Sequence, residues 1–242
     1  MMTRKNIIFL YALRKSIPVF CGYIFLGMAF GILLAQNGYN FLWAFFISVV
    51  VYAGSLQFAL VSFLATHTSL TTVALMSLFI NSRHLFYGLP FVEKFKQMGK
   101  FIYPYMIFSL TDETYSILYA CNKQKMAQRR KYRALFYISA LHHGYWIVGS
   151  VIGGLIGQYM SIDFTGIDFS MTALFIVILL EQILHNRKQA LLPASIGLII
   201  SAIGLYLLGA TNFLLPSLLV AVFVVTAQNY YHDKASGGQK HE

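Results

Sequence analysis

The stretch Phe101–Cys121, FIYPYMIFSLTDETYSILYAC, is an apolar run that carries two adjacent carboxylates, Asp112 and Glu113, near its middle. The chain has only eight acidic residues, and no other two are adjacent. A charged side chain at the centre of a membrane helix costs about 2.5–3.5 kcal/mol on insertion scales. If this run crosses a membrane, the pair needs partners, protons or water, which makes it a candidate functional site.

The overall composition is that of a membrane protein. Of the 242 residues, 58% are hydrophobic and 11% are charged, whereas soluble domains carry about 25% charged residues. The sequence therefore predicts an all-α, polytopic membrane protein with a single transmembrane domain over residues 1–242. The net charge is +10, and the basic residues gather between apolar runs. This placement is typical of topology signals and anionic-lipid contacts rather than of nucleic-acid binding.

Catalytic and metal-binding signatures do not stand out. Cys21 and Cys121 lie at or in apolar runs and indicate neither a disulfide framework nor a zinc site. The sequence holds no Walker A, G-x-S-x-G, H-E-x-x-H or Rossmann glycine motif. An intramembrane protease built on Ser55 and His84 has no supporting spacing. We expect no enzymatic activity, no metal and no cofactor.

Apolar runs recur along the whole chain. The short run Ile7–Leu13 lies between basic pairs and is predicted to be an interfacial helix. A basic loop is expected at 122–133 and a polar tail at 230–242. Eight longer runs are candidate spans, at 17–35, 41–64, 70–90, 101–121, 134–157, 169–185, 190–209 and 213–229.

The basic residues give an orientation to these spans. With an inside N-terminus, fourteen Lys and Arg residues fall in inside segments and three, Lys94, Lys96 and Lys100, fall outside. This asymmetry favours eight spans with both termini in the cytoplasm. The lysines after Pro90 fit this topology least well, so a seven-span alternative with one broken or re-entrant segment stays open.

A glycine pattern occurs twice, 122 residues apart. It can mark two independent small-residue packing stripes, or a duplicated four-helix unit with halves 14–121 and 134–229. In an eight-span topology the two halves point the same way, which makes the repeat parallel. The two copies are Gly22-Tyr23-x3-Gly27-x3-Gly31 and Gly144-Tyr145-x3-Gly149-x3-Gly153.

Polar residues also interrupt the second and third spans. Counting at 1.5 Å per residue places Arg83 and Asp112 about 6 Å apart in depth, so they can pair if their spans are neighbours. Such a pair is either structural or part of a transport site. His84 is a candidate interior histidine or proton relay, and His142-His143 is expected near the cytoplasmic surface. Candidate pathway residues beside the carboxylates are Gly54, Ser55, Gln57, Asn81, Arg83, His84 and Tyr115.

These clusters resemble the AzlC family, the large subunit of branched-chain amino-acid exporters. The resemblance covers roughly residues 14–115, while the second half matches mainly in length and hydropathy. The matching pieces are Arg14 and Pro18 before the first glycine pattern, Ser48-x3-Tyr52-Ala53-Gly54-Ser55-x-Gln57-Phe58, Asn81-x-Arg83-His84-x2-Tyr87-Gly88 and Thr111-Asp112-Glu113-x-Tyr115.

The resemblance implies an exporter of leucine, isoleucine and valine in the bacterial cytoplasmic (inner) membrane, with a separate small hydrophobic subunit of the AzlD type. In such an exporter, Asp112 or Glu113 would take the substrate ammonium. Arg83, or a helix N-terminus at Gly54-Ser55, would take the carboxylate. Phe58, Phe86 and Tyr115 would form an apolar wall. A protonatable carboxylate would also suit coupling to the proton motive force.

Two other function classes remain open from the sequence. A channel or ion-conducting subunit would use the glycine-rich spans to line a pore, and its current would not saturate with amino acid. A scaffold subunit would use the polar clusters only to hold a partner, so Asp112→Asn would lose assembly of the complex rather than transport alone.

Overall fold

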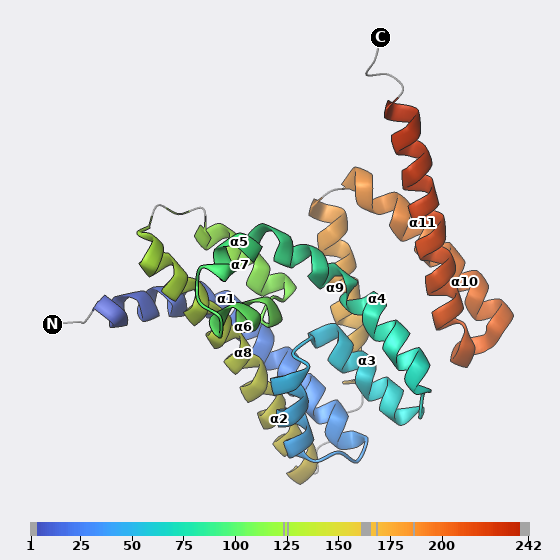
Figure 1. Ribbon diagram of the computed structural model, residues 1–242. Coiled ribbons are helices and arrows are strands. Elements are labelled where there is room, and N and C mark those ends of the chain that lie inside the picture. The colour runs from blue at the N-terminus through green and yellow to red at the C-terminus, as the bar shows by residue number, and fades with distance from the viewer. Residues whose placement is uncertain are drawn as a thin grey trace. The chain divides into compact units, whose positions relative to one another are not determined.

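The computed structural model describes residues 4–122, 124, 126–160, 166–167, 169–185 and 187–237 (Figure 1). Within these ranges all regular structure is helical, as the sequence predicted. The chain divides into two compact units, 1–171 and 172–242. The elements are α1 (Arg4–Gln36), α2 (Phe41–Val50), α3 (Gly54–Ala65), α4 (Leu70–Gly88), η1 (Leu89–Phe91), α5 (Val92–Lys96), α6 (Ile102–Phe108), α7 (Asp112–Asn122), α8 (Gln128–Tyr159), α9 (Phe169–His185), α10 (Arg187–Asn212) and α11 (Leu214–Gly237).

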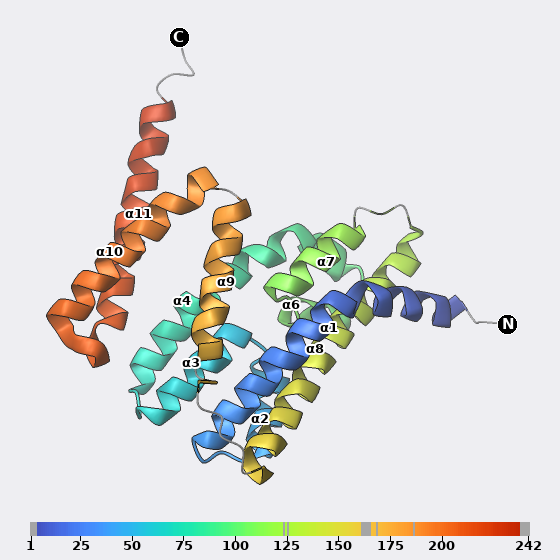
Figure 2. The same cartoon turned by 180° about the vertical axis from the view of Figure 1, so that it is seen from behind.

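The first unit is built around two long helices, α1 and α8, which lie side by side in both views (Figures 1 and 2). Residues Ile7–Leu13 are helical as predicted, but they do not form a separate helix, because they continue directly into the first span as part of the 33-residue α1; their interfacial position stays a prediction. Pro18 lies inside α1, and the helix bends part-way along its length (Figure 2). The predicted loop 122–133 is also shorter than expected, since α8 begins at Gln128.

The two glycine patterns face each other across the contact between α1 and α8. A Cβ added at Gly27 would lie 3.2 Å from the Gly149 carbonyl carbon, and one at Gly31 would lie 2.9 Å from that of Gly153. A Cβ at Gly149 would lie 2.8 Å from the Ile24 carbonyl oxygen. Only glycine lets two helix backbones come this close. The glycine stripes are therefore the contact surface between these two helices.

The contacting glycines keep the spacing of the sequence repeat. Gly27 meets Gly149 and Gly31 meets Gly153, each pair 122 residues apart. Residue numbers rise together along both helices, so α1 and α8 run parallel. By contrast, a Cβ at Gly22 or Gly144 would meet nothing within 4 Å, so these two glycines lie outside the contact. Duplication of whole four-helix halves stays a prediction.

The parallel course of α1 and α8 bears on the topology. Both helices are long and apolar enough to cross a membrane. If both cross in the same direction, the chain between them must cross an odd number of times. Three crossings at 41–64, 70–90 and 101–121 satisfy this condition, and so does one crossing with two re-entrant segments, whereas a single re-entrant segment among these three would violate it. The total number of spans stays a prediction.

A buried apolar cluster packs α5, α6 and α7 against the N-terminal halves of α1 and α8. Phe91 and Phe95 stack with ring centroids 5.0 Å apart, and both are fully buried. Met106, Leu118 and Ile138 complete the centre of this cluster. It fixes α6 and α7 beside the two long helices, where the carboxylate pair lies.

The second unit contains a hairpin of α10 and α11. Gly209 has φ of +73° and interrupts α10 near its end, so the regular helix stops where the sequence placed the end of a span. Gly204 packs directly against Ser217 of α11. The side chains of Glu181 and His185 on α9 lie outside the described residues.

Large apolar side chains are exposed on the helices of both units, as a lipid-facing surface requires. Phe25, Val50, Leu198 and Phe223 are each at least 65% exposed. In the described ranges, three helices are long and apolar enough to span a membrane, Asn6–Gln36, Gln128–Tyr159 and Ala190–Gly209. Shorter apolar helices are Phe41–Val50, Gly54–Ala65, Leu70–Ser82 and Pro216–Gln228.

The contact between α1 and α8 gives a matched pair of variants. Gly31→Ala places a methyl group into the Ser150 carbonyl oxygen, which cannot move without shifting the α8 backbone. We expect Gly31→Ala to lower the stability of the folded protein by about 3 kcal/mol or more. Its abundance in the membrane should therefore fall sharply. Gly22→Ala adds the same methyl group to the same helix in open space, and it should leave abundance unchanged. Equal abundance of the two variants would contradict the contact.

Candidate functional site

The predicted span at 41–64 is broken in its middle. α2 ends at Val50, and α3 begins at Gly54, where a helix N-terminus was predicted. Between them Tyr52 has φ of +38°, a left-handed conformation that costs a non-glycine residue about 1–3 kcal/mol. α2 and α3 have ten and twelve residues and rise about 15 and 18 Å. Each is much shorter than the hydrocarbon core of about 30 Å.

Gln57 holds this first break together. Its side chain is fully buried, and its Oε1 accepts hydrogen bonds from the Trp146 Nε1–H at 2.9 Å and the Ala53 N–H at 3.2 Å. Its Nε2 donates to Ser48 Oγ at 3.2 Å. At the end of α2, the Ser48 carbonyl oxygen lies 3.2 Å from His143 Nε2. Backbone groups released by the break are thus paired with side chains of α3 and α8.

The predicted span at 101–121 is also broken. The sequence predicted a continuous helix with the carboxylates near its centre, but α6 ends at Phe108 and α7 begins at Asp112. Thr111 Oγ1 accepts the Thr114 N–H at 3.2 Å, which is the hydrogen bond of an N-cap residue. Asp112 and Glu113 therefore occupy the first turn of α7, where the helix dipole favours negative charge.

The two breaks come together beside α1 and α8. The Tyr52 ring lies 6.0 Å from the Phe108 ring at the end of α6 and 4.3 Å from the His143 imidazole on α8. The Tyr52 hydroxyl lies near those of Tyr23 and Thr114 without hydrogen-bond geometry to either. We name the residues gathered here the polar cluster: Tyr23, Ser48, Tyr52, Gln57, Thr111, Glu113, Thr114, His142 and His143.

Glu113 differs from the rest of the polar cluster because it is exposed. Its Oε2 accepts a hydrogen bond of 2.8 Å from the Tyr23 hydroxyl, which is itself buried. In the polar cluster, the side chains of Gln57 and His142 are therefore buried inside the protein, whereas Glu113 lies at the protein surface. An exposed carboxylate in a membrane-spanning region requires water, a partner or a substrate beside it.

Three candidate pathway residues were predicted on the third span, and the structure places them on α4, which contacts α7. They are Asn81, Arg83 and His84. Tyr87 of α4 stacks on Tyr115 of α7 with centroids 5.0 Å apart, and His84 lies 5.7 Å from Tyr87. Asn81 Oδ1 is buried and has no hydrogen-bond partner among the described residues. The Arg83 side chain lies outside the described residues. Its pairing with Asp112 stays a prediction, and α4 and α7 are the neighbours that this pairing needs.

The residues of the predicted apolar wall, Phe58, Phe86 and Tyr115, do not meet in the contacts described. Phe58 is buried against Phe30 of α1, 6.1 Å away, whereas Tyr115 stacks on Tyr87 and Tyr119. The Phe86 side chain lies outside the described residues. Gly54 packs closely against the Trp146 ring, which a Cβ would approach to 3.2 Å. Aromatic surface near the breaks thus comes from Tyr52, Phe108 and Trp146.

Several members of the polar cluster were not singled out from the sequence. His142 is fully buried and His143 is 9% exposed, so neither lies on the surface of the protein, and their place near the cytoplasmic surface of the membrane stays a prediction. Because α8 begins at Gln128, His142 lies about 21 Å along it. Tyr23 could have been found from its place in the glycine pattern, and Trp146 from its position between the α8 glycines.

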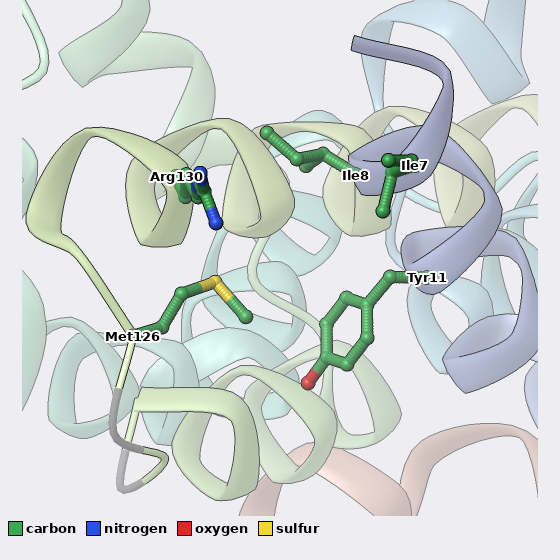
Figure 3. A pocket seen from close by; sticks show the side chains of 5 residues that line it. All are labelled: Ile7, Ile8, Tyr11, Met126 and Arg130. Atoms are coloured by element: carbon green, nitrogen blue, oxygen red, sulfur yellow. The ribbon is translucent and has the colours of Figure 1, made fainter. Parts of the chain in front are cut away.

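A separate cavity lies near the beginning of α8 (Figure 3). It has a volume of about 180 Å³ and is lined by Ile7, Ile8, Tyr11, Met126 and Arg130. The Tyr11 and Met126 side chains point toward each other (Figure 3). The cavity shares no residue with the polar cluster. Among the described residues, no three His, Cys, Asp or Glu side chains group as a metal site would require.

Comparison with known proteins identifies the family. The family model described as AzlC protein matches residues 18–160, a segment that contains both breaks and the whole polar cluster. The chain belongs to the AzlC family. It is a membrane protein, and the resemblance drawn from its sequence is confirmed.

Relatives of the chain span most of its length. The branched-chain amino acid transport protein AzlC of Bacillus subtilis is 35% identical over 93% of this chain and 86% of its own. An uncharacterized membrane protein of Helicobacter pylori is 38% identical over 88% of this chain and 92% of its own. Inner membrane protein YgaZ of Escherichia coli is 28% identical over 89% and 86%. No solved structure gives a significant match to the chain.

Gln57 gives a test of how the first break is stabilised. Gln57→Leu keeps the volume but leaves the Trp146 and Ala53 N–H groups without their acceptor. Because an unsatisfied buried donor costs about 1–3 kcal/mol, we expect a clearly lower thermal midpoint for the detergent-solubilised protein. Gln158→Leu is the control, since that exposed side chain accepts only the Phe41 N–H. A midpoint for Gln57→Leu as high as that of the control would contradict this role of Gln57.

Proposed function

We propose that this chain is the large subunit of an exporter of leucine, isoleucine and valine in the bacterial cytoplasmic membrane. The observation that carries the proposal is the meeting of two broken helices at the polar cluster, within the segment that the family model matches. Broken helices beside buried polar groups are how many transporters build a substrate site in the middle of the membrane. The name of the B. subtilis relative, branched-chain amino acid transport protein AzlC, supplies the substrate class, which is branched-chain amino acids.

The chemistry of an amino acid fits the two breaks. Glu113 is an exposed carboxylate that can take the substrate ammonium. The N-terminus of α3 at Gly54, where the helix dipole favours negative charge, suits the substrate carboxylate. Tyr52, the residue two positions before Gly54, lies close enough to Glu113 for the two side chains to interact electrostatically. Phe108, which is 38% exposed, offers aromatic surface to a branched aliphatic side chain, and the buried Tyr52 ring packs 6.0 Å from it.

Export is proposed to be driven by the proton motive force. Glu113 can carry a proton, and substrate ammonium and proton would then compete for one carboxylate. Such competition links the outward movement of an amino acid to the inward movement of a proton. Asp112, the next residue, is a second carboxylate that can share this role, and Arg83 on the neighbouring α4 is proposed to balance the charge.

The proposed assembly includes a small hydrophobic membrane subunit of the AzlD type, with both termini of the present chain in the cytoplasm. The distribution of Lys and Arg supports this orientation. The exposed apolar side chains of α1 and α2, such as Phe25 and Trp43, are a surface that lipid or this subunit would cover.

The test is amino-acid efflux from cells loaded with leucine-containing dipeptide, with and without the co-expressed small subunit. Glu113→Gln should lower efflux about tenfold or more, since a hydrogen bond to a charged group contributes about 1.5–3 kcal/mol and about 1.4 kcal/mol is tenfold. Asp112→Asn and Arg83→Gln should also lower it. Membrane abundance is measured in parallel.

The matched control is Glu93→Gln, which removes an exposed carboxylate that forms an ion pair with the nearby Lys96. It should leave efflux unchanged. Loss of abundance together with efflux in Glu113→Gln would make the carboxylate structural. Normal efflux in Glu113→Gln at normal abundance would refute its role in transport.

A further inference from the structure

A continuous row of hydrogen-bonded hydroxyl groups joins Glu113 to His142. The Tyr23 hydroxyl bonds both Glu113 Oε2, at 2.8 Å, and Thr111 Oγ1. Thr111 Oγ1 bonds Thr114 Oγ1 at 2.9 Å, and Thr114 Oγ1 bonds His142 Nδ1 at 3.0 Å. The row links a carboxylate on α7 to an imidazole on α8 through one tyrosine of α1 and two threonines at the second break.

The row runs from an open end to a closed end. Glu113 is exposed, while Tyr23 is 4%, Thr111 7%, Thr114 0% and His142 0% exposed. At the closed end, His142 Nε2 is buried and has no hydrogen-bond partner among the described residues. A network that served packing alone would pair this nitrogen, because a buried polar atom without a partner is costly.

Capping of α7 accounts for only part of this arrangement. Thr111 Oγ1 caps the helix by accepting the Thr114 N–H, and that bond needs no hydroxyl on Thr114. The Thr114 hydroxyl instead connects Thr111 to His142, and the Tyr23 hydroxyl connects Thr111 to Glu113. These two hydroxyls are the links that capping leaves unexplained.

Hydroxyl groups suit proton movement because each one both donates and accepts a hydrogen bond. With Glu113 protonated, each group in the row can donate toward His142. If every group then passes its proton one step along, Glu113 loses a proton, His142 Nδ1 gains one, and all three hydroxyls are restored with their bonds reversed. The imidazolium then holds the transferred proton, and the reversed hydrogen bonds allow the same row to return it to Glu113.

We propose that Tyr23, Thr111 and Thr114 form a proton relay between Glu113 and His142, which makes His142 the inner proton-binding site of the transporter. The proposal rests on the proton coupling assigned under the proposed function. Other titratable groups face the relay, and they act on its ends without lying in the row. They are Asp112 on α7, Tyr52 at the first break, and His143 and Tyr145 on α8.

The test separates net transport from exchange. The chain and its small subunit are reconstituted in proteoliposomes with labelled leucine. Accumulation driven by an imposed pH gradient needs a proton to move, whereas leucine–leucine exchange at equal pH does not. Thr114→Val keeps the shape and the capping N–H but removes the linking hydroxyl. We expect its gradient-driven accumulation to fall at least about tenfold, with exchange retained.

Controls keep the result interpretable. Thr114→Ser retains the hydroxyl and should restore accumulation. Ser139→Ala removes a buried hydroxyl of α8 that lies outside the row and should change neither activity. Tyr23→Phe tests the other link, with the ring kept against Trp146. Its gradient-driven accumulation should fall as that of Thr114→Val does, so the relay stays testable even if Thr114→Val folds poorly.

The outcomes distinguish this proposal from the proposed function. If the unmodified protein ignores the pH gradient, proton coupling itself fails. If it responds, and Thr114→Val and Tyr23→Phe respond equally, the relay is wrong while coupling stands. If both variants lose exchange together with accumulation at normal abundance, the hydroxyls serve substrate binding and the relay is again overturned.

Discussion

A membrane helix that is interrupted must find partners inside the protein for the backbone groups it releases, because the hydrocarbon core offers none. This constraint organises the first unit of the chain. At the first break Gln57 takes the Ala53 N–H, and His143 lies against the Ser48 carbonyl. At the second break Thr111 takes the Thr114 N–H. The side chains that satisfy the breaks form the polar cluster, so structural need and transport chemistry share the same residues.

Close packing of α1 and α8 makes this arrangement possible. The glycines at 27, 31, 149 and 153 bring the two backbones into direct contact, and the larger side chains beside them project around the contact. Tyr23 thereby reaches Glu113, His142 reaches Thr114, and Trp146 reaches Gln57. The glycine pattern visible in the sequence therefore serves the site directly, because it sets the distance between the two helices that supply a third of the residues of the polar cluster.

Much of the fold could be predicted from the sequence, since hydropathy and charge distribution mark membrane helices well. Asp112 and Glu113 stood out because acidic residues are rare in this chain. The second break was harder to predict, because Ser109–Thr111 contains neither glycine nor proline and the apolar run continues through it. The burial of His142 and His143 could not be foreseen from the apolar run alone, because α8 begins at Gln128, before that run. Tyr23, Thr114 and His142 come together only through tertiary packing across three helices, which no spacing within one segment reveals.

The central claim is that the two breaks line the pathway of the substrate. Its most direct test is the rate at which a polar maleimide labels Ser55→Cys at the start of α3, in membranes and with Cys21 and Cys121 replaced by alanine. Glu93→Cys in the same background reports on a site away from the polar cluster. Leucine should slow the labelling of Ser55→Cys and leave the labelling of Glu93→Cys unchanged. If Ser55→Cys still exports leucine but is never labelled, or is labelled at a rate that leucine does not change, the breaks do not form the pathway.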